Sequence, residues 1–301
     1  MSCTITVVTP SFNQAQFLEE TLRSVLSQRE QAHEYFVIDG GSIDGSAEII
    51  RQYADRGGID FWVSEKDSGQ AEAIHKGFSR ATGDVLAWLN SDDVYLPGAL
   101  AQVRSAFDTH PEWDALTAYH VRMDAQSRIL SAHRIPGENP RLARWGMHHV
   151  NQQTCFFRRS LYERVGPIDR SLHCVLDTEL WSRMFDAGAT WGHIPRYLAG
   201  FRQHAAAKGS SWSEAYPREE QWMRDHYPQY NADTMKHRLG ILAYRATQVL
   251  SGRHLRAASE TGRWRGKTLD AVFGRHRPAD AAGAGGAGGA EAANRGGGVV
   301  A

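Results

Sequence analysis

Hydrophobic and polar positions alternate with two different periods along the first hundred residues. Short apolar runs rich in β-branched residues predict strands at 5–9, 35–38, 59–63 and 85–89. Between them, apolar residues recur at every third or fourth position, which predicts helices around 18–26, through 49–50 and at 70–79. Strands that alternate with helices indicate a mainly parallel sheet covered on both faces, and ligands of such sheets bind at the carboxyl ends of the strands.

The pattern changes beyond residue 110. Two short runs, 115–121 and 128–133, flank a polar turn and predict a β-hairpin, and helices are expected near 159–165 and 177–187. A later amphipathic helix has an apolar stripe made of Met235, Leu239, Leu242, Ala246 and Val249. The Gly/Ala-rich stretch from Ala281 onward has little to bury. We therefore expect an α/β domain at 1–210, a helical, basic extension at 211–275 and a disordered tail at 276–301.

Composition narrows the class of protein. Of the 301 residues 42% are hydrophobic and 23% charged, and the formal net charge is zero, so bulk charge does not indicate a nucleic-acid partner. Cys3, Cys155 and Cys174 form no C-x-x-C pair, which favours reduced thiols in the cytoplasm over disulfides or a zinc site. Because the sequence shows neither a signal peptide nor an apolar run long enough to span a bilayer, we expect a soluble protein.

Three carboxylates follow predicted strands. Asp39 comes after the second strand, and Asp92 and Asp93 come after the fourth. Because these loops leave a parallel sheet on the same side, we expect the carboxylates to converge on one cleft. Two adjacent aspartates repel each other, and a bound Mg²⁺ or Mn²⁺ would relieve that repulsion and attract a diphosphate. The alternative is that Asp92 or Asp93 caps the helix expected near Pro97.

The sequence contains none of the common dinucleotide, P-loop or hydrolase motifs. Instead, it resembles the family 2 glycosyltransferases, which have a GT-A fold and transfer a sugar with inversion of configuration at its anomeric carbon. The resemblance covers roughly residues 3–210. Its clearest segments are VVTPSFN at 7–13, FVIDGGSIDGS at 36–46, SEKDSG at 64–69, ATGD at 81–84 and LNSDD at 89–93. Weaker likeness continues at 151–157, 165–169 and 176–181.

The resemblance implies a site for a nucleotide-diphosphate sugar at the strand ends. Thr9, with its neighbours Pro10 and Ser11, would line the base pocket, and Asp39 would accept a hydrogen bond from the base. Ser91 and Asp92 are expected near the ribose and Asp93 on the metal, although the order Ser-Asp-Asp leaves open which aspartate binds the metal directly. Further along the chain, Asp67 and Gly69 would border the donor pocket, with helix capping as the alternative for Asp67.

Two later positions take catalytic roles by the same resemblance. Asp177 matches the general base, which would take the proton of the acceptor hydroxyl during attack. Members of the family often carry Glu-Asp there, whereas this chain has Leu176 before Asp177. Helix capping is the alternative for Asp177. His204 is a candidate third metal ligand, the alternative being an exposed loop histidine, and His148 and His149 are expected either to face the acceptor or to be structural.

We therefore predict an inverting glycosyltransferase of bacterial polysaccharide or glycoconjugate synthesis, acting on a glycan or lipid-linked acceptor. The alternatives are a sugar nucleotidyltransferase, which should carry basic residues in the loop after the first strand, and a non-catalytic nucleotide-sugar-binding protein. Residues 233–277 carry ten Lys/Arg and three acidic residues. The apolar stripe of this extension would either touch an anionic membrane, at the cytoplasmic face, or pack on the catalytic domain or form a homodimer.

Overall fold

The computed structural model describes residues 2–29, 31–143, 146, 148–205, 207, 215–230 and 234–276 of the chain. The predicted disordered tail therefore lies outside the described residues, apart from His276. Among the described residues the three cysteines are free, as expected.

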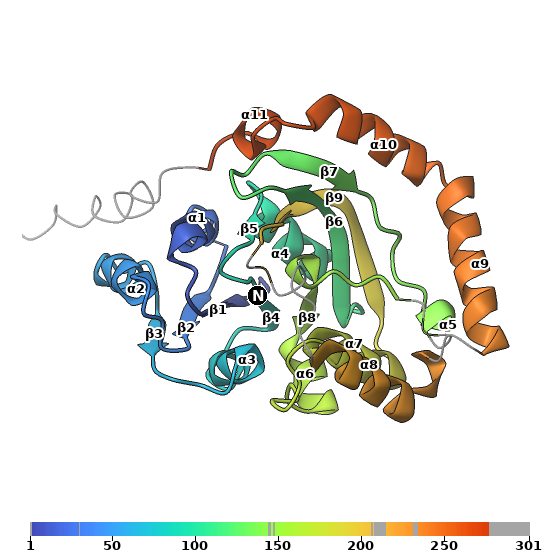
Figure 1. The fold of residues 1–301 in the computed structure, drawn as a ribbon, viewed down its shortest axis with the longest axis horizontal. Coiled ribbons are helices and arrows are strands. Elements are labelled where there is room, and N and C mark those ends of the chain that lie inside the picture. The colour runs from blue at the N-terminus through green and yellow to red at the C-terminus, as the bar shows by residue number, and fades with distance from the viewer. Residues whose placement is uncertain are drawn as a thin grey trace, which may run out of the picture.

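One mixed sheet forms the centre of the molecule (Figure 1). Its strands are β1 (Ile5–Ser11), β2 (Glu34–Asp39), β3 (Phe61–Ser64), β4 (Val85–Trp88), β5 (Val94–Tyr95), β6 (Ala115–Met123), β7 (Ile129–His133), β8 (Phe156–Arg158) and β9 (Trp191–Arg202). They lie in the order β3-β2-β1-β4-β8-β6-β9-β5, with β7 paired to β6. The first four strands are parallel to one another, and β6 and β9 form a second parallel pair.

Helices cover both faces of the sheet (Figure 1). The core on one face includes α1 (Ala15–Leu26), α2 (Ser46–Asp55) and α4 (Ala99–Thr109). The core on the other face includes α3 (Gln70–Phe78), the short helix α5 (Pro140–Ala143), α6 (Arg159–Val165), α7 (Leu176–Asp186) and α8 (Ala215–His226). Strand β1 separates the two cores, because Val7 belongs to one and Val8 to the other, as the alternation of side chains along a strand requires.

The predicted strands and helices of the first hundred residues are confirmed, with small shifts at their ends. The hairpin is confirmed as well, and Asp124 shapes its turn by accepting hydrogen bonds from the backbone N–H groups of Gln126 and Arg128 at 2.9 Å each. Strand β9 was not predicted, because Gly192, Pro195 and Gly200 interrupt its apolar pattern. It nevertheless pairs with β6 along its whole length.

The C-terminal extension runs along the edge of the sheet (Figure 1). Beyond α8, which packs in the core of the domain, its elements are the 3-10 turn η2 (Pro228–Tyr230), α9 (Met235–Leu250), α10 (Arg253–Trp264) and α11 (Leu269–Phe273). Glu260 of α10 pairs with Arg134 and accepts a hydrogen bond from Tyr197. Leu269 of α11 joins a small apolar cluster with β5, β6 and β7.

The apolar stripe of α9 does not contact the domain. Met235, Leu239, Leu242 and Val249 are all exposed, and the helix instead turns the buried Gly240 and the half-buried Tyr244 inward. The structure therefore contradicts the expectation that these side chains pack on the catalytic domain. Along the described part of the chain, no helix combines the length and apolar character needed to cross a membrane.

Candidate active site

The carboxyl ends of β1, β2 and β3 bring three polar side chains into register. Ser11 pairs with Asp39, which in turn pairs with Ser64. The Asp39 carboxylate is buried and accepts hydrogen bonds from the backbone of Ser42 at 2.9 Å and from the hydroxyls of Ser42 and Ser64 at 2.5 and 2.7 Å. Ser11 Oγ is buried and has no partner within the described protein. A ligand at this edge would therefore find a free hydroxyl beside a carboxylate that is already held in place.

Thr9 lies deeper than its expected role requires. Its side chain is fully buried, and Oγ1 shares a hydrogen bond of 3.0 Å with the hydroxyl of Tyr35. Pro10 is buried as well. Of the three neighbouring positions, Ser11 is thus the one whose side-chain polar atom remains unpartnered.

Asp67 and Gly69 shape the start of helix α3. Asp67 Oδ1 accepts a hydrogen bond of 3.0 Å from the backbone N–H of Gly69, which is the geometry of the capping alternative. Burial raises the pKa of Asp67. A Cβ at Gly40 would lie 3.0 Å from Asp67 Oδ1, so this carboxylate touches the turn that follows Asp39. The first helical residue, Gln70, donates to Asn90 Oδ1 at 2.6 Å and so joins α3 to the end of β4.

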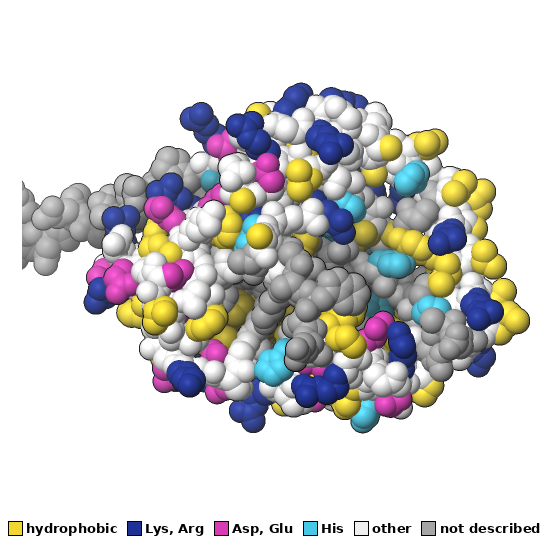
Figure 2. Space-filling view, in the orientation of Figure 1, with side chains coloured by type: hydrophobic (Ala, Val, Ile, Leu, Met, Phe, Trp, Pro, Cys, Tyr) yellow, Lys and Arg dark blue, Asp and Glu magenta, His cyan; other side chains and the backbone are white. Residues whose placement is uncertain are grey.

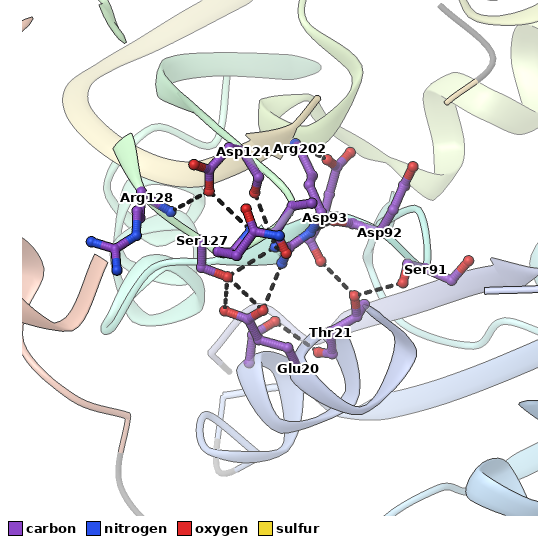
Figure 3. Close-up of polar contacts among 12 residues, drawn as sticks. Glu20, Thr21, Ser91, Asp92, Asp93, Asp124, Ser127, Arg128 and Arg202 are labelled. Atoms are coloured by element: carbon purple, nitrogen blue, oxygen red, sulfur yellow. Dashed lines mark hydrogen bonds and ion pairs between the residues drawn. The ribbon is translucent and has the colours of Figure 1, made fainter. Parts of the chain in front are cut away.

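The tandem aspartates that follow β4 occupy different environments (Figure 3). Asp93 is 1% exposed, and its Oδ1 accepts a hydrogen bond of 2.9 Å from the backbone N–H of Arg202. Its Oδ2 is buried without a partner in the described protein. Burial, followed by the charge of Asp92, raises the pKa of Asp93 well above its usual range. Ser91 is buried too, and its carbonyl accepts from Thr21 Oγ1 at 2.9 Å.

Arg202, at the end of β9, ties this loop to two other elements (Figure 3). Its Nε donates to the carbonyl oxygen of Asp92 at 2.7 Å. Its Nη1 donates to Ser127 Oγ in the hairpin turn at 2.9 Å, and its Nη2 donates to Glu20 of α1 at 2.7 Å. The guanidinium also lies over the ring of Phe17, 4.8 Å from its centre. The sequence indicated no such role for Arg202, because its partners are far away along the chain.

Asp92 is more accessible than Asp93 and faces His204. Its Oδ2 lies 3.0 Å from His204 Nε2, and the His204 ring rests 4.5 Å from the ring of Phe17. An adjacent carboxylate oxygen and imidazole nitrogen suit a divalent cation such as Mn²⁺. In the part of the chain that the structure describes, no group of three His, Cys, Asp or Glu residues is placed to hold a metal. A cation here would therefore complete its shell with water and ligand oxygens.

Asp177 lies in the first turn of α7. Its Oδ1 accepts a hydrogen bond of 2.6 Å from the backbone N–H of Thr178, and burial raises its pKa. Four residues further, and hence on the same side of the helix, Trp181 stacks on Trp88 of β4 at 5.3 Å. Both tryptophans are core residues. Glu219 of α8 fixes the loop before the helix by accepting from the backbone of Cys174 at 2.7 Å.

A cavity of about 400 Å³ opens beside this helix start. Its walls come from β6, β7, the segment 148–151, η2 and α9, and they include Thr178, the neighbour of Asp177. The four histidines of this cavity are His120, His133, His148 and His149. Burial lowers the pKa of all four, to about 3 for His120 and about 4 for His133 and His148. They are therefore neutral near pH 7.

Several ring nitrogens around the cavity lack partners within the described protein. They are His120 Nδ1, His149 Nε2 and both nitrogens of His148. Two tyrosines, Tyr230 and Tyr244, add aromatic walls, and the Tyr244 ring lies 3.7 Å from that of His149. A pocket with neutral imidazoles and aromatic faces suits a hydroxylated ring, because an aromatic face can cover the apolar side of the ring and imidazoles can pair with its hydroxyls.

Glu138 is an acidic group near this cavity that sequence reasoning missed. It accepts a hydrogen bond of 3.1 Å from the backbone N–H of His149, and burial raises its pKa to about 8. Its charge, like that of Asp177, raises the pKa of Cys155 after burial has done so. The two acids therefore both lie near Cys155. No motif surrounds Glu138 in the sequence, and its place became clear only in the fold.

Comparisons with known proteins agree with this architecture. A family profile described as Glycosyl transferase family 2 matches residues 6–166. An uncharacterised glycosyltransferase of Mycobacterium tuberculosis is 31% identical over 181 residues, which are 58% of this chain and 66% of that protein. The O-antigen biosynthesis protein RfbC of Myxococcus xanthus is 30% identical over 68% of this chain and 16% of its own length. The chain thus spans less than two thirds of these curated relatives.

Solved structures show the same fold. A mannosyltransferase of Pyrobaculum calidifontis, in complex with GDP-Man and Mn²⁺, superposes with a TM-score of 0.56 over 87% of this chain and 79% of that chain, at 19% identity. The predicted GT-A fold is confirmed by this likeness.

Proposed function

Because the chain belongs to glycosyl transferase family 2, we propose that it transfers a sugar from a nucleotide-diphosphate donor to an acceptor hydroxyl, with inversion at the sugar. The observation that carries this proposal is the approach of Asp92 to His204 at the strand ends, within a fold in which Thr178, the neighbour of Asp177, lines a separate cavity. The Asp92–His204 pair would thus serve the diphosphate, and the cavity would receive the acceptor.

The donor would lie across the carboxyl ends of β1, β2 and β4. Ser11 and Asp39, which pair across the ends of β1 and β2, would contact the base, and Asp67 and Gly69 at the start of α3 would border the donor pocket. The carbonyl of Ser91 accepts a hydrogen bond from Thr21, and the adjacent Asp92, which faces His204, would lie near the ribose and the diphosphate.

Asp92 and His204 are the residues that would hold Mg²⁺ or Mn²⁺. Asp93 would support them from behind, because its carboxylate is buried and fastened to the backbone of Arg202. When bound, the cation would neutralise the charge that develops on the departing diphosphate. The unpartnered Asp93 Oδ2 is the second oxygen that a small shift of this loop would offer.

Asp177 would take the proton from the attacking hydroxyl. Its raised pKa makes the carboxylate a better proton acceptor than an exposed aspartate, and its hydrogen bond to Thr178 N–H orients the other oxygen. The cavity next to Thr178 would receive the acceptor, whose sugar hydroxyls suit the unpartnered imidazole nitrogens. The relation to RfbC supports an acceptor glycan of bacterial polysaccharide synthesis.

The two alternative functions are less well supported. A sugar nucleotidyltransferase should carry basic residues in the loop after β1, and residues 9–13 contain none. A protein that only binds nucleotide sugars would not need a carboxylate of raised pKa beside a second, acceptor-sized cavity.

The substitution Asp177→Asn tests the base. We expect calorimetry with Mn²⁺ and a panel of nucleotide sugars to show unchanged donor binding, while transfer to a panel of methyl glycosides falls by about 10²–10⁴-fold. Asp186→Asn, an exposed position at the other end of α7, is the matched control and should retain transfer. Asp92→Asn and His204→Ala should each weaken Mn²⁺-dependent donor binding at least about tenfold.

The outcomes separate the parts of the proposal. If Asp177→Asn transferred sugar at the wild-type rate, only the assignment of Asp177 as the base would be wrong. If no nucleotide sugar binds the wild-type protein with Mn²⁺, the proposed function as a whole is wrong.

A further inference from the structure

The outer surface of α9 and the start of α10 carries large apolar side chains that cover nothing. We call it the outer apolar face, and it consists of Met235, Leu239, Leu242, Val249, Leu250 and Leu255. Their exposed fractions run from 47% for Leu239 to 86% for Leu250. Single exposed apolar residues are common on protein surfaces, but a contiguous group marks an interaction site.

The same surface is strongly basic. Residues 234–259 contain Lys236, Arg238, Arg245, Arg253 and Arg256 and no acidic residue, although the chain as a whole has zero formal charge. Figure 2 shows hydrophobic and basic side chains together along the rim that α9 forms. Acidic side chains gather mainly at the opposite end of this view, over α1 and α2.

Helix α9 is already fixed to the domain by its other side. Gly240 is buried, Tyr244 contacts His149, and His237 Nδ1 lies 3.3 Å from the carbonyl oxygen of Gln229. The outer apolar face is therefore not the side by which α9 contacts the domain. It is a second apolar surface on the same helix, parallel to its axis, with cations on its flanks.

We propose that the outer apolar face docks on the surface of an anionic phospholipid membrane. Apolar side chains would enter the boundary between headgroups and acyl chains, and the arginines and the lysine would pair with lipid phosphates. A second copy of the chain is a less favourable partner for the outer apolar face. An isologous dimer through this face would bring five cations of one copy against five of the other, with no acidic residue in 234–259 to compensate.

Docking would also orient the cavity. Tyr244 lines it from the inner side of α9, so the helix that lies on the membrane is a wall of the cavity. On the proposed function, this arrangement suits an acceptor that is attached to a lipid. The docking itself requires no donor, acceptor or metal, and its test is therefore independent of transfer.

The experiment is co-sedimentation of the full chain with vesicles. We expect binding to vesicles of phosphatidylcholine mixed with phosphatidylglycerol, little binding to phosphatidylcholine alone, and a steep loss of binding as salt is added. Leu242→Asp should weaken binding at least about tenfold. Arg245→Glu should weaken it about fivefold for each unit of charge removed.

Two matched controls lie at the other end of the molecule. Ile43→Asp places the same acid at an apolar side chain that is 93% exposed, and Arg51→Glu reverses the charge of an exposed arginine on α2. Both should bind vesicles like the wild type. Equal binding to the two kinds of vesicle, no binding to either, or loss of binding in the controls would overturn the proposal. So would a dimer in sedimentation-velocity runs that Leu242→Asp dissociates, since a second copy would then occupy the face.

Discussion

Replacing Arg202 with Met removes a buried cation that joins three elements. Methionine keeps most of the apolar stem and deletes the guanidinium, which lies over the ring of Phe17. The side chain is fully buried, so water does not replace its hydrogen bond to the carbonyl oxygen of Asp92. The perturbation therefore isolates the polar role of Arg202.

The magnitude follows from the three partners. The pair with Glu20 contributes about 1 kcal/mol or less, because Glu20 is 46% exposed. The bonds to the Asp92 carbonyl and to Ser127 Oγ are made by a charged, buried donor and contribute about 1.5–3 kcal/mol each. We expect Arg202→Met to lower the free energy of unfolding by about 3–7 kcal/mol in total. Because Asp92 is held by the same bond, Mn²⁺-dependent donor binding should weaken as well.

Urea unfolding followed by circular dichroism measures this loss, with Arg51→Met as the control at an exposed site, where we expect a change within about 0.5 kcal/mol. A double-mutant cycle with Glu20→Gln then separates the exposed pair from the rest. A loss below about 1 kcal/mol, or a cycle that assigns most of the loss to Glu20, would refute the reasoning that the buried partners dominate.

Two further predictions concern packing and pH. Gly77→Ala should lower the free energy of unfolding by about 1–3 kcal/mol in urea titrations, because a Cβ there would lie 2.5 Å from Val8 Cγ1, whereas Gly262→Ala in α10 meets nothing within 4 Å and should not destabilise. Burial acts to raise the pKa of Glu260, but hydrogen bonds from Arg134 and Tyr197 outweigh it and lower that pKa below 4.5. A lowered pKa stabilises the fold above the unfolded-state value and not at lower pH, so hydrogen exchange should show α10 protected above about pH 4.5 and progressively less protected in more acidic solution. Glu260→Gln should remove that pH dependence, and an unchanged profile in this variant would contradict the assignment.

The sequence predicted the parts of the fold in which local pattern and burial agree. The strands that lead to Ser11, Asp39 and Asn90 are short apolar runs bounded by polar turns, and such runs are recognisable without their partners. Motif resemblance then singled out Asp92, Asp177 and His204, and the structure places Asp92 and His204 within 3.0 Å of each other.

The remainder depends on contacts between distant segments. The inward side of α9 presents Gly240 and the half-buried Tyr244 rather than the stripe of Leu and Val. Hydrophobic periodicity reports only apolar character, and it therefore identified the outer side of α9 as the apolar face. Glu138 carries no motif, and the contacts of Arg202 and Glu138 arise only when β9 and the segment before His148 reach their places in the fold.

Strand β9 has a practical consequence for anyone who cuts or grafts this protein. The family profile ends at residue 166, yet β9 lies between β6 and β5 in the sheet, ends with Arg202 and leads directly to His204. A fragment that stops at the end of the profile would leave the edge of β6 open and strip β5 of its neighbour. In chimaeras between relatives, the junction should therefore lie beyond residue 205, after β9 is complete.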